Sequence, residues 1–179
     1  VLALGGGAFV VAWSGIDAAF GPDHTVLFSR SVDGGDTWST PQAIDPISAD
    51  DGIADITPVG AINGDGTIMI AWVRDTDSST IHEVTSSDGA LSWSAVNEVT
   101  AIGPDKEPAL AADGEGGWFL AFEGAPIGSS QALSTIRSAG NPAWEPPGIL
   151  GGMNGAADVS VARVTSGLLS LWTESGGNF

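Results

Sequence analysis

Several residue types are scarce or missing from this sequence. Cysteine is absent, which excludes disulfides, thiolate metal sites and a thiol nucleophile. Only 5 Lys and Arg residues stand against 22 Asp and Glu, so the formal net charge is −17. Because binding phosphates requires clustered basic side chains, this balance excludes a nucleic-acid partner and argues against an anionic membrane surface. No apolar run reaches the roughly 18 residues that a membrane span needs, so none is expected.

Long helix-forming segments are missing as well. The 26 Gly and 10 Pro residues interrupt the chain at short intervals. The one long stretch without either, residues 67–88, is rich in Ile, Val, Thr and Ser. Short runs of β-branched residues between turn residues are typical of β-strands. Since 42% of the residues are hydrophobic, there is also enough apolar material for a core. The sequence therefore predicts an all-β protein.

Aromatic residues recur at regular intervals along the chain. One series ends four hydrophobic runs, at spacings of 59, 50 and 50 residues: Trp13, Trp72, Phe122 and Trp172. A second series has spacings of 55 and 51 residues: Trp38, Trp93 and Trp144. A period near 50 residues with short strands in each repeat is typical of β-propeller blades. We therefore predict one partial propeller domain over 1–179, with repeats at about 1–50, 51–102, 103–152 and an incomplete 153–179.

Each repeat is interpreted as up to four antiparallel strands. The first strand is predicted at about 1–4, 58–62, 108–112 and 158–163, and a glycine-rich turn follows it. The second strand ends at the first aromatic series. The third is predicted at about 24–31, 79–86 and 133–138, and the fourth begins at the second tryptophan series. This pattern gives three full blades and the first hairpin of a fourth, about three and a half blades.

A polar motif separates the third and fourth strands. Residues 31–38 read Ser-Val-Asp-Gly-Gly-Asp-Thr-Trp, residues 86–93 are a weakened copy, and a shorter copy is expected to start at Ser138. An Asp carboxylate can accept backbone N–H groups in a tight turn, and glycine permits a positive φ there. The tryptophan can then cover apolar surface. We predict structural rather than catalytic roles for these residues: Ser31, Asp33, Gly35, Thr37, Trp38, Ser86, Asp88, Ser92 and Trp93.

This motif, repeating in register with the tryptophan series, resembles the Asp-box, or BNR repeat, of sialidases and related β-propellers. The resemblance extends over the chain as repeats, and the first copy of the motif is intact. It implies a six-bladed propeller, which at about 50 residues per blade needs roughly 300 residues. The remaining blades would belong to the same polypeptide or to a second copy. The resemblance also implies a secreted or cell-surface protein.

The functional face of a propeller is built from the loops between its second and third strands and from the connections between blades. In this sequence those segments are rich in Asp and Glu. Such carboxylates suit sugar hydroxyls, and they also suit Ca²⁺, although no cofactor or metal site is predicted. The alternative is an ordinary solvated acidic surface. The candidate ligand-binding residues are Asp55, Arg74, Asp75, Glu107 and Glu123.

For a sialidase, the resemblance implies three arginines on the substrate carboxylate, an Asp acid/base and a Tyr–Glu nucleophile pair. Tyrosine is absent, and of the four arginines only Arg74 is expected on the functional face. The family's Arg-Ile-Pro motif has no counterpart, because the matching positions read Ile-Thr-Pro at 56–58 and Lys-Glu-Pro at 106–108. Asp23 is the candidate acid/base. Complete sialidase chemistry is not expected in this chain alone.

Two functions remain open at this point. The first is a segment of a secreted sialidase-like propeller from a glycoside-hydrolase-type or glycan-binding protein, with glycans or glycoproteins as partners. The second is a non-catalytic propeller scaffold that binds proteins or glycans through its loops.

Overall fold

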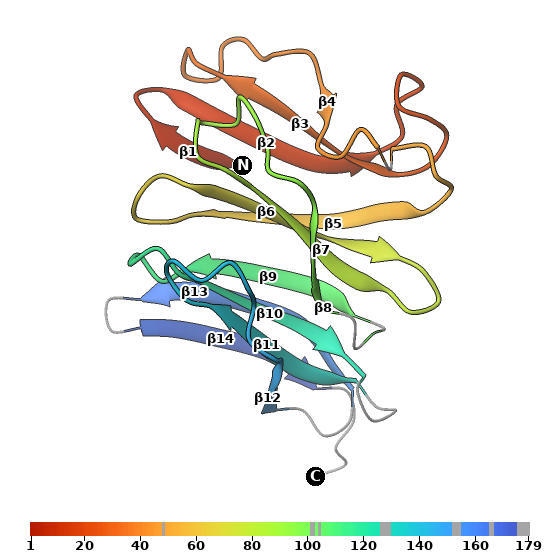
Figure 1. Ribbon diagram of the computed structural model, residues 1–179, viewed down its shortest axis with the longest axis vertical. Coiled ribbons are helices and arrows are strands. Elements are labelled where there is room, and N and C mark those ends of the chain that lie inside the picture. The colour runs from red at the N-terminus through yellow and green to blue at the C-terminus, as the bar shows by residue number, and fades with distance from the viewer. Residues whose placement is uncertain are drawn as a thin grey trace.

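The chain folds into successive antiparallel sheets. The computed structural model describes residues 1–47, 49–100, 103, 105–125, 130–151, 155–164 and 167–174. Within these residues the secondary structure consists of fourteen strands and no helix. Figure 1 shows the sheets following one another along the long axis of the molecule. The all-β, blade-like fold predicted from the sequence is confirmed.

Three sheets have four strands, and in each sheet the spatial order follows the sequence. The first contains β1 (Leu2–Gly5), β2 (Ala8–Gly15), β3 (Thr25–Ser31) and β4 (Gln42–Ala43). The second contains β5 (Ala54–Ile62), β6 (Ile68–Asp75), β7 (Thr80–Ser86) and β8 (Asn97–Thr100). The third contains β9 (Lys106–Ala112), β10 (Trp118–Gly124), β11 (Gln131–Arg137) and β12 (Gly148–Gly151). A hairpin of β13 (Ala156–Val164) and β14 (Gly167–Glu174) follows.

The first strand of each later sheet starts earlier than predicted. β5, β9 and β13 begin at residues 54, 106 and 156, because each contains a bulge that the sequence pattern does not show. At the bulge one residue per strand has a positive φ: Thr57 at 50°, Glu107 at 49° and Asp158 at 52°. A bulge allows a strand to contain proline, which has no N–H to donate to the ladder. Pro58 and Pro108 therefore lie inside strands rather than at their ends.

The fourth strand of each sheet starts later than predicted. β4, β8 and β12 each begin four residues after the tryptophan, at residues 42, 97 and 148. Proline residues at 41, 146 and 147 immediately precede two of these strands and cannot donate hydrogen bonds to the ladder. The tryptophan thus belongs to the turn and not to the fourth strand.

The core lies between neighbouring sheets, and β6 contributes to it from both faces. Three of its residues pack toward the first sheet, and the three that alternate with them pack toward the third. All six are at most 2% exposed: Ile68, Ile70 and Trp72 on one face, and Met69, Ala71 and Val73 on the other. Because successive side chains of a strand point to opposite faces, this near-continuous apolar run indicates a sheet covered on both sides.

The first two copies of the polar motif, residues 31–38 and 86–93, form turns that we call the S-x-D turns. Asp33 Oδ1 accepts the backbone N–H of Thr37 at 2.9 Å and the Ser31 hydroxyl at 2.8 Å. Asp88 Oδ1 accepts the N–H of Ser92 at 3.0 Å in the same way. These hydrogen bonds to the charged form lower the pKa of Asp33 to about 2, led by the bond from the Thr37 hydroxyl.

The tryptophans of the two S-x-D turns differ in their burial. Trp93 packs edge-on against Phe28 of the first sheet, with the ring centroids 5.4 Å apart. Trp38 is 43% exposed, so the prediction that it covers apolar surface fails in this copy. Its indole instead donates to the Gly35 carbonyl at 3.0 Å. The difference arises because Trp93 packs on the preceding sheet, whereas the described residues contain no sheet before the one that carries Trp38.

The third copy of the motif begins at Arg137, one residue earlier than predicted. Backbone hydrogen bonds align Ile136 with Arg30 and Thr85, so Arg137 takes the place of the serine in the other two turns. The copy therefore has the same length as the others, with Ala139 replacing the aspartate. The Arg137 side chain extends back to Glu83 of the second sheet, with NH1 2.7 Å from Oε1. An ion pair between sheets thus replaces the hydrogen bonds of an S-x-D turn.

Candidate functional site

The candidate site lies at the end of the sheets opposite the S-x-D turns. β5 starts at this end and β6 returns to it, so that Asp55 and Arg74 are cross-strand partners. Two of the predicted ligand-binding residues are thus neighbours although nineteen positions separate them in the sequence. β7 then leads away from this end toward the second S-x-D turn.

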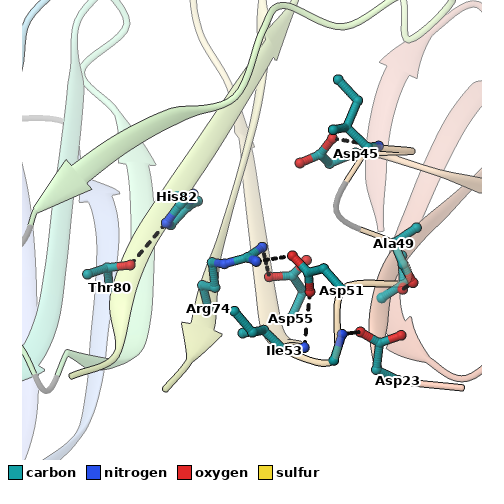
Figure 2. Close-up of polar contacts among 12 residues, drawn as sticks. Asp23, Asp45, Ala49, Asp51, Ile53, Asp55, Arg74, Thr80 and His82 are labelled. Atoms are coloured by element: carbon teal, nitrogen blue, oxygen red, sulfur yellow. Dashed lines mark hydrogen bonds and ion pairs between the residues drawn. The ribbon is translucent and has the colours of Figure 1, made fainter. Parts of the chain in front are cut away.

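Arg74 contacts two carboxylates, which with it form what we call the Arg74 cluster (Asp51, Asp55 and Arg74). Its NH2 contacts Asp51 Oδ2, and its NH1 lies 3.8 Å from Asp55 Oδ1. Figure 2 shows the two carboxylates converging on the guanidinium, Asp51 from the connection between the first two sheets and Asp55 from β5. Asp51 is not among the ligand-binding residues predicted from the sequence. The signal was the acidic pair at 50–51, close before the strand that carries Asp55.

The two carboxylates of the Arg74 cluster differ in exposure and in pKa. Asp55 is 2% exposed, and burial raises its pKa to about 6 against the opposing effects of the Trp72 indole and Arg74. Burial would also raise the pKa of Asp51, but the bonds from Arg74 and from the Ile53 N–H bring it below its usual value. Asp51 is therefore the more acidic and the more accessible of the two, with 30% of its side chain exposed. Asp55 lies beneath the guanidinium and positions it.

Asp23 lies beside this cluster and holds the loop that carries Asp51. Its Oδ2 accepts the backbone N–H of Gly52 at 3.0 Å, as Figure 2 shows. His82 lies on the neighbouring strand, where burial lowers the pKa of its imidazole and Arg74 lowers it further. The Thr80 hydroxyl is 3.0 Å from His82 Nε2. The structure thus places Asp23, the candidate acid/base, near the Arg74 cluster, where it accepts a hydrogen bond from backbone.

The other three candidate residues make contacts away from the Arg74 cluster. Asp75 accepts the Ser79 hydroxyl at 3.1 Å at the exposed end of β6. The Glu107 carboxylate accepts the backbone N–H of Asp158 and so links β9 to β13. Glu123 accepts the hydroxyl of Ser130. The structure therefore brings together only part of the predicted set.

A further buried carboxylate, Asp105, takes the position of Asp55 in the third sheet. The Asp105 N–H bonds to the Ser79 carbonyl at 2.9 Å, just as the Asp55 N–H bonds to the His24 carbonyl at 2.8 Å. The position across from it, occupied by Arg74 in the second sheet, is Gly124. Asp105 is 0% exposed, and this burial without a facing cation raises its pKa to about 7. The sequence repeat of 50 residues between Asp55 and Asp105 was the available signal.

Neither a group of metal ligands nor a membrane-spanning helix occurs in the described part of the chain. Among the residues that the structure describes, no three His, Asp or Glu side chains are grouped closely enough to hold a metal ion. In the same part of the chain no helix is long and apolar enough to cross a membrane.

The sheets have the fold of the propeller glycosidases, a class that includes sialidases and arabinanases. The chain is similar to a Hadza microbial sialidase, with a TM-score of 0.66 and 17% identity over 96% of this chain and 40% of that one. It is similar to the α-L-arabinanase of Penicillium chrysogenum, with a TM-score of 0.62 and 14% identity over 92% and 53%. It is also similar to the leech intramolecular trans-sialidase, with a TM-score of 0.59 and 17% identity over 92% and 26%.

These similarities concern the fold and only part of each relative. The chain spans 26% to 53% of the three solved structures. No protein-family model matches the sequence, and no curated protein matches it. The fold is therefore that of a glycosidase-type propeller, while the chemistry has to be argued from the residues of this chain.

Proposed function

We propose that this chain is a segment of a secreted, sialidase-like propeller from a glycoside-hydrolase-type or glycan-binding protein, and that the Arg74 cluster binds sugar. The S-x-D turns are, on this proposal, Asp-boxes that stabilise the fold. The carrying observation is the similarity to propeller glycosidases over more than nine-tenths of the chain, combined with an accessible carboxylate–guanidinium pair at the loop end of the sheets. The remaining blades would belong to the same polypeptide or to a second copy.

On this proposal, two residues of the Arg74 cluster contact the sugar and the third positions them. The ionised Asp51 accepts hydrogen bonds from sugar hydroxyls, and the outer N–H groups of Arg74 donate to sugar oxygens. The buried Asp55 fixes the guanidinium and does not itself touch the ligand. Asp23 holds the backbone at Gly52 and so keeps Asp51 in place.

Hydrolysis by this chain alone is not expected. The sequence contains no tyrosine that could act as a nucleophile, and it places one arginine at the candidate site. Most glycosidases use a pair of carboxyl groups, one on each side of the scissile bond. Asp55 is covered by its neighbours, so it is not available as the second group.

Binding is tested by ligand-observed NMR and calorimetry with a panel of oligosaccharides. We expect Asp51→Asn to weaken binding at least tenfold, because the variant exchanges a charged acceptor for a neutral amide. Asp77→Asn, which removes one exposed charge from the neighbouring loop, is the matched control and should bind as the wild type does. Equal affinities for wild type and Asp51→Asn would contradict the assignment of this site.

The second candidate is a non-catalytic scaffold that binds proteins or glycans through the same face. It is favoured by the observation that Arg74 is already paired with carboxylates of its own chain. Fluorogenic glycosides distinguish the candidates when tested on a protein that contains this chain and the remaining blades. Turnover supports the enzyme, and glycan binding without turnover supports the scaffold.

A further inference from the structure

We infer that the Arg74 cluster takes a neutral glycan rather than one that carries a carboxylate, sulfate or phosphate. The inference rests on the proposed function and narrows its ligand. Recognition of an anionic sugar requires a cation that is free to pair with it, most often an arginine in bidentate geometry. The structure shows that this requirement is not met at the cluster.

Arg74 is not free to pair with a ligand anion. Asp51 and Asp55 both approach its guanidinium, and only 18% of its side chain is exposed. Two negative charges therefore surround one positive charge whenever Asp55 is ionised. With Asp55 protonated, the pair of Arg74 and Asp51 is still neutral. An incoming anion would have to displace Asp51 from the guanidinium and would then face an unpaired carboxylate.

Three of the other basic side chains lie at the far end of the sheets. Arg30 donates to the Gly89 carbonyl at 2.7 Å in the second S-x-D turn, and Arg137 pairs with the buried Glu83. Arg163 lies against Gly114 in a turn at that same far end. None of the three can move to the Arg74 cluster without crossing the length of a sheet.

Lys106 is the remaining basic residue of the five. It is the exposed first residue of β9, and Glu107 follows it directly. Against this single cation, the surroundings of the Arg74 cluster contain further carboxylates at Asp23 and Asp45, as Figure 2 shows. Anions are repelled from a face with such an excess of negative charge, and like charges brought together oppose binding.

A neutral sugar meets none of these obstacles. Its hydroxyl groups donate to the exposed oxygen atoms of Asp51, and its ring and hydroxyl oxygens accept from Arg74 without breaking the ion pair. Carboxylates are strong acceptors for hydroxyl donors, so the same charges that repel an anion favour a polyol.

The experiment compares neutral and anionic glycans on the same protein at low salt. The neutral probes are arabino-, xylo- and galacto-oligosaccharides and methyl-esterified oligogalacturonides. The anionic probes are 3′-sialyllactose and the unesterified oligogalacturonides, which share the sugar backbone of the esters but carry a charged carboxylate in place of each methyl ester. We expect at least one neutral probe to bind, and every anionic probe to bind at least tenfold more weakly than that one.

Two variants test the cause of this preference. Asp51→Asn removes the competing carboxylate from Arg74, so each anionic probe should bind at least tenfold more tightly than it binds the wild type, although neutral probes bind more weakly. Asp77→Asn changes the net charge equally and should leave the affinity for anionic probes unchanged. Melting curves of both variants establish that they are folded.

The outcomes separate this inference from the proposed function. Tighter binding of an anionic probe than of every neutral probe would overturn the inference and leave glycan binding intact. Failure of Asp51→Asn to tighten the binding of any anionic probe would also overturn it, since the pairing of Arg74 would then not be the cause. Absence of binding to any probe would overturn the proposed function, and the inference with it.

Discussion

The alignment of Arg137 with the serines of the S-x-D turns can be tested by mutation. The test gives the interface between the second and third sheets the residues found between the first and second sheets. Glu83 in the second sheet occupies the position of Phe28 in the first, since their cross-strand partners Asn97 and Gln42 are equivalent. Phe28 packs on Trp93. Glu83 lies in the equivalent place beside Trp144. Burial raises the pKa of Glu83, and the Trp144 indole opposes this rise. The double variant Glu83→Phe with Arg137→Ser therefore copies the first interface into the second.

The magnitudes follow from the burial of the pair. Glu83 has 3% of its side chain exposed and Arg137 has 13%, so removing either partner leaves a charge with little water. Breaking such a pair costs about 3–5 kcal/mol. In the double variant, burying a phenylalanine contributes about 1.5–3 kcal/mol and an edge-on contact with tryptophan about 0.5–1.5 kcal/mol. We expect the double variant to lie within about 1–2 kcal/mol of the wild type.

The assay is urea denaturation followed by the fluorescence of the seven tryptophans, for the wild type, both single variants and the double variant. These magnitudes imply a coupling energy of at least about 4 kcal/mol between the two positions, above the usual range for residues in contact because each single variant leaves a buried charge unpaired. If the double variant loses as much stability as the two single variants together, the two interfaces are not equivalent. The alignment of Arg137 with the serines of the S-x-D turns would then be wrong.

Three further predictions concern carboxylates. The pKa values of about 6 for Asp55 and about 7 for Asp105 exceed those in the unfolded chain, so the folded state binds protons more tightly. The free energy of unfolding should therefore fall as pH rises from about 4 to 7. Thermal melts at pH 4.5, 6 and 8 measure this, and a melting temperature that rises over this range contradicts it. Asp105→Asn should raise stability by about 1–2 kcal/mol at pH 8, after allowance for solvent screening, and have little effect at pH 5, where Asp105 is already protonated. Asp33→Ala should lower the melting temperature while its exposed neighbour variant Asp36→Ala does not, because only Asp33 accepts the hydrogen bonds of the turn; equal melting temperatures for the two variants would refute this role.

Much of the fold could be predicted because each sheet repeats a local pattern. Apolar alternation, glycine turns and regularly spaced tryptophans depend on residues close in sequence, and they predicted the four-stranded sheets correctly. The limits of the strands were harder to predict. The bulges at Thr57, Glu107 and Asp158 have no signature in hydrophobic periodicity, since their positive φ values result from pairing with the next strand.

The candidate site could be predicted only in part, because burial between sheets is a tertiary property. Asp55 and Arg74 were identified from their place in the repeat. The role of Asp51 depends on how a loop folds back over Arg74, which no local pattern encodes. The start of the third copy of the motif was predicted one residue too late, at Ser138 instead of Arg137, because the motif begins with a serine in the other two copies. The physical difference, an ion pair with Glu83, involves a residue 54 positions away.

The order of strands within the sheets has a consequence for the kinetics of folding. In each four-stranded sheet every strand pairs with the strand next to it in the sequence. Closing short loops costs little entropy, so such a sheet can form faster than sandwiches whose strands pair over long separations. Each sheet can begin to form while the chain is still being synthesised. It becomes stable only when the next sheet covers its second apolar face, so assembly should proceed in the order of synthesis.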